Sequence, residues 1–213
     1  MTDQLSLYNR ALRHLKVRRL ANLNEDVLAR YEMDAVYTEV KQAMLEKAGW
    51  KFALRTSQLT ADADDSPSFG LNYAFTLPDD LVRWAAICLD DQLNVEDGSF
   101  DIKNGLLFSN SQILYVKYVS NGATYGFDLS KFPDNYCEAF ACEMAERTAL
   151  LITKDDAIYQ KVQQDNVRLL ARAKNFDAIQ EAVRFKPAGT FTSSRRTTGA
   201  GPYFRNGNMR LGG

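Results

Sequence analysis

The chain has 213 residues, of which 46% are hydrophobic and 11% aromatic, and this composition excludes a body that stays disordered. Its formal net charge of −1 is uneven, because residues 186–213 contain five basic residues and no acidic one, which leaves −6 on the rest. Such an acidic body argues against a general nucleic-acid-binding domain, which would carry a clustered basic face. The length suits one domain, or one domain with an insertion.

The N-terminal residues contain no basic region that leads into an apolar run, so we expect no secretory signal. No stretch approaches the roughly 18 apolar residues that a membrane-crossing helix requires, and no membrane partner is expected. The three cysteines, Cys88, Cys137 and Cys142, are odd in number and lie among apolar residues. We expect them to be reduced and buried in a cytosolic product.

Two helices are predicted in residues 1–49. Thr2 or Asp3 can cap the first helix, and Asn24 is expected to open the second, with acidic residues in its first turn. Gly49 is expected to end the second helix in the left-handed conformation, which glycine adopts without steric cost. Apolar side chains recur at helical spacing in both segments, at Leu5, Tyr8, Leu12 and Leu15 and at Val36, Val40, Ala43 and Met44.

Residues 50–132 change to alternating periodicity, which predicts a small antiparallel β domain. Trp50, Phe52 and Leu54 would lie on one face of its first strand, and we expect them to form a buried domain seam with the helices. The runs with strand character are Trp50–Leu59, Leu81–Leu89, Ser99–Ser109 and Ile113–Val119. Hairpin turns are predicted at Asp97-Gly98, Asn104-Gly105 and Asn121-Gly122.

Helical periodicity returns in residues 133–185. Pro133 and Asp134 are expected to start a third helix, and Lys154-Asp155-Asp156 marks the break before a fourth. Two helices therefore precede the strands and two follow them. This order predicts an α+β fold, a discontinuous four-helix bundle with an inserted small antiparallel β domain and an extended C-terminal arm.

Residues 186–213 lose all periodicity and hold six of the twelve glycines. We predict a flexible arm that is disordered alone and folds onto a partner. A frayed terminus without a role is an alternative, and so is single-stranded nucleic-acid binding, for which five charges are few. The candidate contacts are the apolar anchors Phe191, Tyr203, Phe204 and Leu211 and the carboxylate-binding Arg195, Arg196, Arg205 and Arg210.

No catalytic, metal or cofactor site is predicted, and we do not expect an enzyme. The only histidine, His14, lies on an amphipathic helix, and nothing indicates a nucleophile that it could activate. Cys137 and Cys142 are five positions apart and diverge around a helix, which does not suit a zinc site. Adjacent acidic pairs in predicted turns are typical of solvated caps, and Gly199 and Gly201 are not followed by the helix of a phosphate loop.

Four motifs together suggest a family. They are Leu7-Tyr8-Asn9-Arg10-Ala11-Leu12 in the first helix, Gly49-Trp50-Lys51-Phe52-Ala53 after the second, Leu77-Pro78-Asp79-Asp80 before a strand, and Phe132-Pro133 before the third helix. With these residues the chain resembles, over roughly residues 3–180, the head-to-tail adaptor family of short-tailed bacteriophages (podoviruses), also called tail tubular protein A.

The resemblance implies a virion protein made in the host cytoplasm, a homo-oligomeric ring of twelve copies docked beneath the portal protein. Its helices would contact the portal, its β domain would face the tail nozzle protein, and the arm would lie along a portal subunit. The ring would form part of the DNA ejection channel. DNA would pass through without specific binding, because repulsion from an acidic body disfavours adhesion.

Two other functions stay open at this point. The chain could be a stopper or tail-completion connector, which ring stoichiometry and position in a virion image would distinguish. It could also be a tail-associated cell-wall hydrolase, for which a turbidity assay on peptidoglycan is the discriminating test.

Overall fold

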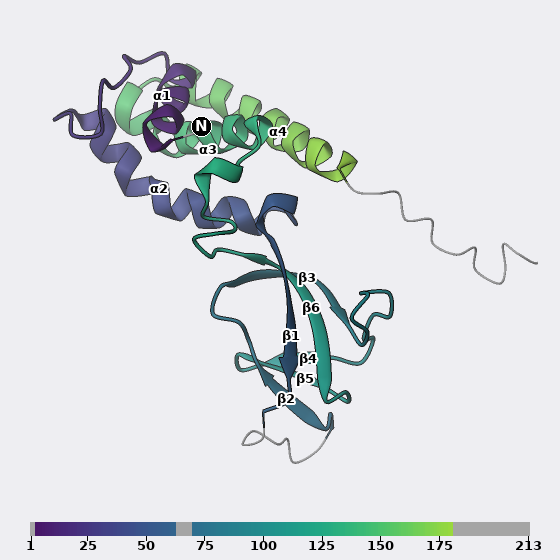
Figure 1. Ribbon diagram of the computed structural model, residues 1–213. Helices are drawn as coiled ribbons and strands as arrows, with labels where there is room; N and C mark the ends of the chain where they lie inside the picture. Colours follow the sequence, from purple (N-terminus) through teal and green to yellow (C-terminus); the bar gives the residue numbers. More distant parts are fainter. Residues whose placement is uncertain (1–2, 63–69, 181–213) are drawn as a thin grey trace, which may run out of the picture. The chain divides into compact units, whose positions relative to one another are not determined.

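The computed structural model describes residues 3–62 and 70–180, which belong to a compact unit that ends at Gln180 (Figure 1). The predicted arm, 186–213, lies outside these residues. The helices are α1 (Gln4–His14), α2 (Leu28–Glu46), α3 (Asp134–Thr153) and α4 (Asp156–Ile179), with short 3-10 helices η1 (Lys51–Ala53) and η2 (Leu129–Lys131). The strands are β1 (Leu54–Thr60), β2 (Tyr73–Thr76), β3 (Leu81–Cys88), β4 (Asp101–Lys103), β5 (Leu106–Ser109) and β6 (Ile113–Ser120). The predicted α+β class is confirmed.

The first helix begins where the sequence predicts, but the second does not. The Asp3 carboxylate accepts the Ser6 N–H at 2.9 Å and so caps α1. Helix α2 begins at Leu28, not at Asn24, and has no acidic residue in its first turn. The expected capping residues stabilise the preceding loop instead, because Glu25 accepts the Ala21 N–H at 2.9 Å.

The predicted end of α2 at Gly49 is also wrong. The helix ends at Glu46, and Gly49 does not adopt a positive φ. The indole N–H of Trp50 instead donates to the Met44 carbonyl at 2.6 Å, which satisfies one of the last carbonyls of the helix. A side chain thus supplies the partner that a glycine-ended turn would have provided.

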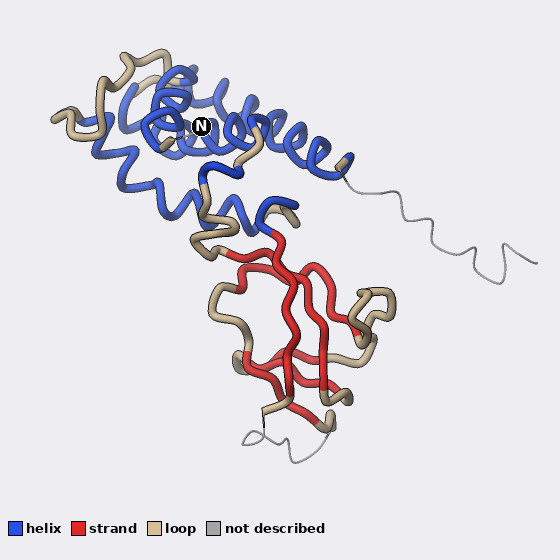
Figure 2. Tube along the Cα trace, viewed as in Figure 1, coloured by secondary structure: helices blue, strands red, loops and turns tan. Residues whose placement is uncertain are grey.

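Trp50 and Phe52 do not lie on a strand. Residues 51–53 form η1, and β1 starts only at Leu54, as the change of colour between α2 and β1 shows in Figure 2. The 3-10 turn buries Ala53. In the predicted strand, Ala53 would have pointed to the face away from Trp50 and Phe52. The expected alternation fails because a turn with about three residues per period brings different side chains inward.

The strands form two antiparallel sheets of three, in the orders β1-β6-β3 and β2-β5-β4. Asn104 and Gly105 have φ of 50° and 76° and join β4 to β5, as predicted for a tight hairpin. The other two predicted hairpins are wrong. Asp97 is buried and accepts the Ser109 hydroxyl at 2.5 Å, and Asn121-Gly122 leads from β6 toward η2.

The third and fourth helices follow the predicted boundaries. Pro133 precedes α3, which has more buried residues than the other three helices and contacts α1, α2 and α4. Lys154 ends α3 in the left-handed conformation, with φ of 53°, and Asp155 accepts the Ala157 N–H at 2.8 Å to cap α4. The small residues Ala141, Ala145 and Ala149 of α3 are fully buried.

Two apolar cores result. The larger one joins all four helices to η1 and to Val119 of β6, and the smaller one lies between the strands. The smaller core consists of Phe75, Ile87, Leu107, Leu114, Val116 and Tyr118.

Trp50→Ala is expected to lower the free energy of unfolding by about 3–5 kcal/mol, the usual loss for a buried aromatic side chain. Trp50→Phe should lose less, because it keeps an aromatic ring and removes only the hydrogen bond to Met44 and part of the buried ring volume. Phe100→Ala is the control, since Phe100 is exposed, and should change stability by less than about 0.5 kcal/mol. Urea unfolding followed by circular dichroism measures all three, and an unchanged midpoint for Trp50→Ala would contradict the burial.

Candidate functional site at the helix–sheet junction

The three residues of the predicted seam converge on the helical core. Trp50 is 1% exposed, and Phe52 and Leu54 are partly buried against the same core. The Trp50 and Phe52 rings meet the ring of Tyr136 in α3 edge to face, with centroids 4.8 and 4.7 Å apart. Such pairs add about 0.5–1.5 kcal/mol each beyond the buried area.

The backbone of η1 is also tied to the end of α4. The Lys51 N–H donates to the Asp177 carboxylate at 3.0 Å, and Asp177 is buried although it lies in the last turn of its helix. Helices α2 and α4 therefore both bond to the four residues that lead into β1.

Asp80, in the motif before β3, ties three strands together. Its carboxylate accepts the Arg55 guanidinium of β1 at 2.8 Å, and from β6 the Tyr118 hydroxyl at 2.9 Å and the Ser120 hydroxyl at 2.5 Å. Burial alone would raise the pKa of Asp80, but the hydrogen bonds from Ser120, Arg55 and Tyr118 outweigh it and lower the pKa.

The segment after β6 packs closely on α2. A Cβ on Gly126 would lie 2.2 Å from the Ser120 carbonyl oxygen and 2.8 Å from Leu45 of α2, so only glycine fits. Lys41 of α2 donates to the Phe127 carbonyl at 3.1 Å, and burial lowers the pKa of its amine. These contacts hold the segment that follows β6 against α2.

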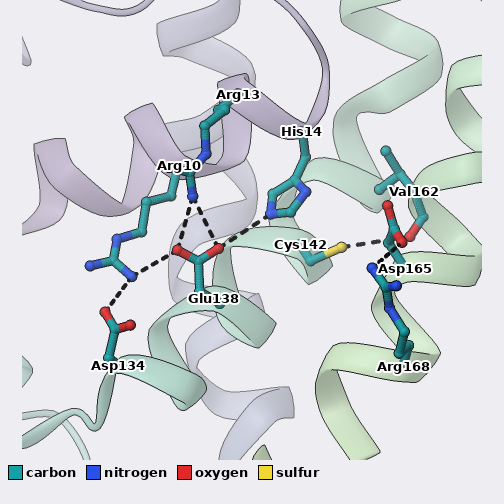
Figure 3. A network of polar contacts seen from close by, with 9 residues as sticks. All are labelled: Arg10, Arg13, His14, Asp134, Glu138, Cys142, Val162, Asp165 and Arg168. Carbon is teal, nitrogen blue, oxygen red and sulfur yellow. Dashed lines mark hydrogen bonds and ion pairs between the residues drawn. The ribbon is translucent and has the colours of Figure 1, made fainter. Parts of the chain in front are cut away.

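Ion pairs link α1 to the first turns of α3. In Figure 3, Arg10, Arg13 and His14 of α1 all point toward Glu138 of α3, and Arg10 also reaches Asp134. The shortest distances are 2.7 Å for Arg10–Asp134 and 2.9 Å for Arg13–Glu138. His14 Nε2 lies 3.6 Å from Glu138.

Glu143 of α3 is the centre of a second polar network. Lys47 contacts it at 2.5 Å, Asn166 of α4 donates to it at 2.8 Å, and Arg147 lies 3.2 Å away. Burial would raise the pKa of Glu143, but the bonds from Lys47 and Asn166 and the charges of Lys47 and Arg147 outweigh it and lower the pKa.

The ionisable side chains of these networks have pKa values shifted by their surroundings. The carboxylates of Asp80 and Glu143 are surrounded by donors, and burial raises the pKa of the Cys142 thiol to about 12, far from the neutral range that acid–base or thiolate catalysis needs. Within residues 3–62 and 70–180, no group of three acidic, histidine or cysteine side chains could hold a metal ion. No helix in these ranges is long and apolar enough to cross a membrane.

Sequence reasoning missed several residues of the junction. Asp80 and Gly126 belong to turns, and Lys41 and Glu143 occupy helical positions that look solvent-exposed in the sequence. Asn9 and Asp80 belong to the four motifs but had no assigned role. The side-chain amide of Asn9 accepts the Leu20 N–H at 2.8 Å and donates to the Leu20 carbonyl at 3.1 Å, which anchors the loop before α2. A lone Asn in an apolar helical stripe was the available signal.

The arm residues Phe191, Arg195, Arg196, Tyr203, Phe204, Arg205, Arg210 and Leu211 lie outside the described residues.

No protein-family model matches the chain, and comparison with curated proteins gives no match.

Asp80→Asn is expected to destabilise the chain by about 2 kcal/mol at neutral pH, because it removes a charged acceptor from three hydrogen bonds. The pKa of Asp80 is lowered in the folded state, so its contribution is present above the unfolded pKa and is lost as pH falls through the folded pKa. The stability difference between wild type and variant should therefore shrink on acidification. Thermal unfolding from neutral to acidic pH measures it.

Asp79→Asn is the matched control, because Asp79 is the exposed neighbour of Asp80. It should change stability by less than about 0.5 kcal/mol. A loss at Asp79 equal to that at Asp80 would contradict the assigned role of the Asp80 carboxylate.

Proposed function

We propose that the chain is a structural virion protein, a head-to-tail adaptor that forms a ring between the portal and the tail nozzle of a short-tailed bacteriophage. It acts through its surfaces and has no catalytic step. Copies of the chain, twelve in the proposed ring, line part of the channel through which DNA is ejected. The net charge of −6 on residues 1–185 favours passage of DNA without adhesion.

The observation that carries this proposal is where the four family-like motifs lie. Asn9 anchors the loop before α2, Trp50 holds the end of α2 against α3, and Asp80 ties the strands. Phe132 precedes α3, and its ring centroid lies 4.8 Å from that of Tyr136. Every motif therefore supplies contacts at a connection between elements, as expected for a structural protein that joins two parts of an assembly.

Exposed apolar side chains support an assembly role as well. On the helices, Val167 is 70% exposed and Ile179 81% exposed. Water contact at such side chains is unfavourable by about 25 cal/mol for each Å² that a partner could cover. The helical group comprises Leu28, Tyr31, Leu150, Leu151, Val167, Phe176 and Ile179, and the strand region has Leu89, Val95, Phe100, Ile102 and Ile113. In the proposed assembly the helices face the portal and the strands face the nozzle.

The purified chain alone should be monomeric or weakly associated and should form a ring only with its portal. The reason is that the arm supplies part of the binding energy, and docked copies then hold their neighbours at high effective concentration. Sedimentation velocity at micromolar concentration, with and without portal rings, measures this. A stable large ring of the chain alone would contradict the proposed order of assembly.

Deleting residues 186–213 should leave a folded, soluble chain that no longer joins portals. Ordering about twenty-five arm residues costs on the order of 25–50 kcal/mol, so the arm binds only if an extended partner surface covers its aromatic anchors and pairs its arginines. The control is the full chain with Thr197→Ala and Thr198→Ala, which keeps every anchor. If the truncated chain joined portals as well as the full chain, residues 186–213 would not be a portal-binding arm. They would then be a frayed terminus without a role.

A further inference from the structure

Four strands lie at the edges of the two sheets. In the order β1-β6-β3 the edges are β1 and β3, and in the order β2-β5-β4 they are β2 and β4. An edge strand presents backbone N–H and C=O groups that can pair with another chain. Natural proteins therefore protect edges with bulges, prolines, charges or very short strands.

Three of the four edges carry such protection. Strand β3 has two shifts of register, between Leu81 and Arg83 and between Trp84 and Ala86. Strand β2 has only four residues and Pro78 follows closely. Strand β4 has three residues, of which Asp101 and Lys103 are charged.

Strand β1 lacks these features. Its seven residues pair with β6 one to one, from Leu54 opposite Val119 to Thr60 opposite Ile113, without any shift of register. The strand contains no proline, lysine or carboxylate, and its single charge, Arg55, is paired with Asp80. Among the strands of the described residues, β1 is the long, regular edge without such protection.

The alternation of hydrogen bonds identifies the outward groups. The Ala61 N–H donates to the Gln112 carbonyl at 3.1 Å, and residue 61 continues the register of β1 opposite residue 112. In an antiparallel pair such bonded positions alternate, so odd-numbered residues of β1 bond to β6. The backbone groups of Thr56, Gln58 and Thr60 point away from β6.

The next even-numbered residue supports this assignment. The Asp62 N–H donates to the Ala74 carbonyl of β2 at 2.9 Å. Asp62 lies two residues after the end of β1, and its N–H therefore points away from β6, as expected for an even-numbered residue. The side chains of Thr56, Gln58 and Thr60 are exposed and polar. The edge is therefore reachable from Thr56 to Thr60.

We propose that the outer edge of β1 binds an extended, basic segment of a partner protein, which adds to the sheet as a further strand. Main-chain hydrogen bonds supply the affinity of this recognition mode, and side-chain contacts supply its specificity. The proposal goes beyond the virion role and does not depend on it.

The basic character of the partner follows from charge. Residues 50–132 hold eleven Asp and Glu against six Lys and Arg, a net charge of −5. Thr56 and Gln58 line an open hollow of about 220 Å³ together with the exposed Asp91. Lys117, opposite Thr56, is the cation of β6, so the favourable place for an incoming lysine or arginine is beside Asp91. Asp62 adds a second carboxylate at the end of the edge.

The test uses the full chain and a synthetic octapeptide in which valine alternates with lysine or threonine. Hydrogen–deuterium exchange is resolved to single amides by NMR. The peptide should slow exchange at Thr56, Gln58 and Thr60 by at least about tenfold and leave the already bonded Ser57 and Leu59 unchanged. The same peptide with glutamate in place of lysine should have no effect.

Two variants at one position separate the edge from its side chains. Gln58→Pro removes an outward N–H but no bond to β6 and should abolish the protection, whereas Gln58→Ala keeps the N–H and should retain it. The wild-type exchange pattern decides the question even if Gln58→Pro fails to fold. Absence of protection at the three outward amides would overturn the proposal. Protection that grows with concentration of the chain alone would also overturn it, by showing that a second copy occupies the edge.

Discussion

The burial of Trp50 is the contact on which the rest of the structure depends. Its indole N–H donates to the Met44 carbonyl in the last turn of α2, and its ring packs on Tyr136 of α3. The turn that places this ring inward also buries Ala53 and directs the chain into β1 at Leu54. One aromatic side chain thereby couples the end of a helix, the start of a sheet and the most buried helix of the fold.

Polar groups complete this coupling in a way that accounts for the acidic residues. Asp80 and Glu143 each accept several charged or hydroxyl donors from different elements, and their pKa values are lowered as a result. Removing one partner of such a carboxylate lowers stability by more than the pair itself contributes, because the remaining charge is left without an opposite charge or donor. Asp80 thus connects the strands, and Glu143 connects α3 to α4 and to Lys47 after α2.

Sequence periodicity predicted the elements that local forces determine. The cap at Asp3, the break at Lys154 and the tight turn at Asn104-Gly105 depend on neighbouring residues alone, and all three are present. The predicted end of α2 at Gly49 and its predicted start at Asn24 were wrong, because contacts made by Trp50 and Glu25 determine these boundaries. The junction was found only in part, because its aromatic residues stand out in the sequence. Asp80 and Lys41 acquire their roles from partners between 25 and 86 positions away, and Gly126 acquires its role from the close approach to α2.

We propose that the helical core and the sheet core act as one cooperative unit, so that a load applied at one set of exposed side chains reaches the other. Differential scanning calorimetry of the full chain measures whether they unfold together. The contacts at Trp50, Asp177 and Asp80 predict a single transition whose calorimetric and van't Hoff enthalpies agree. Two separate transitions, one for the helices and one for the strands, would contradict it.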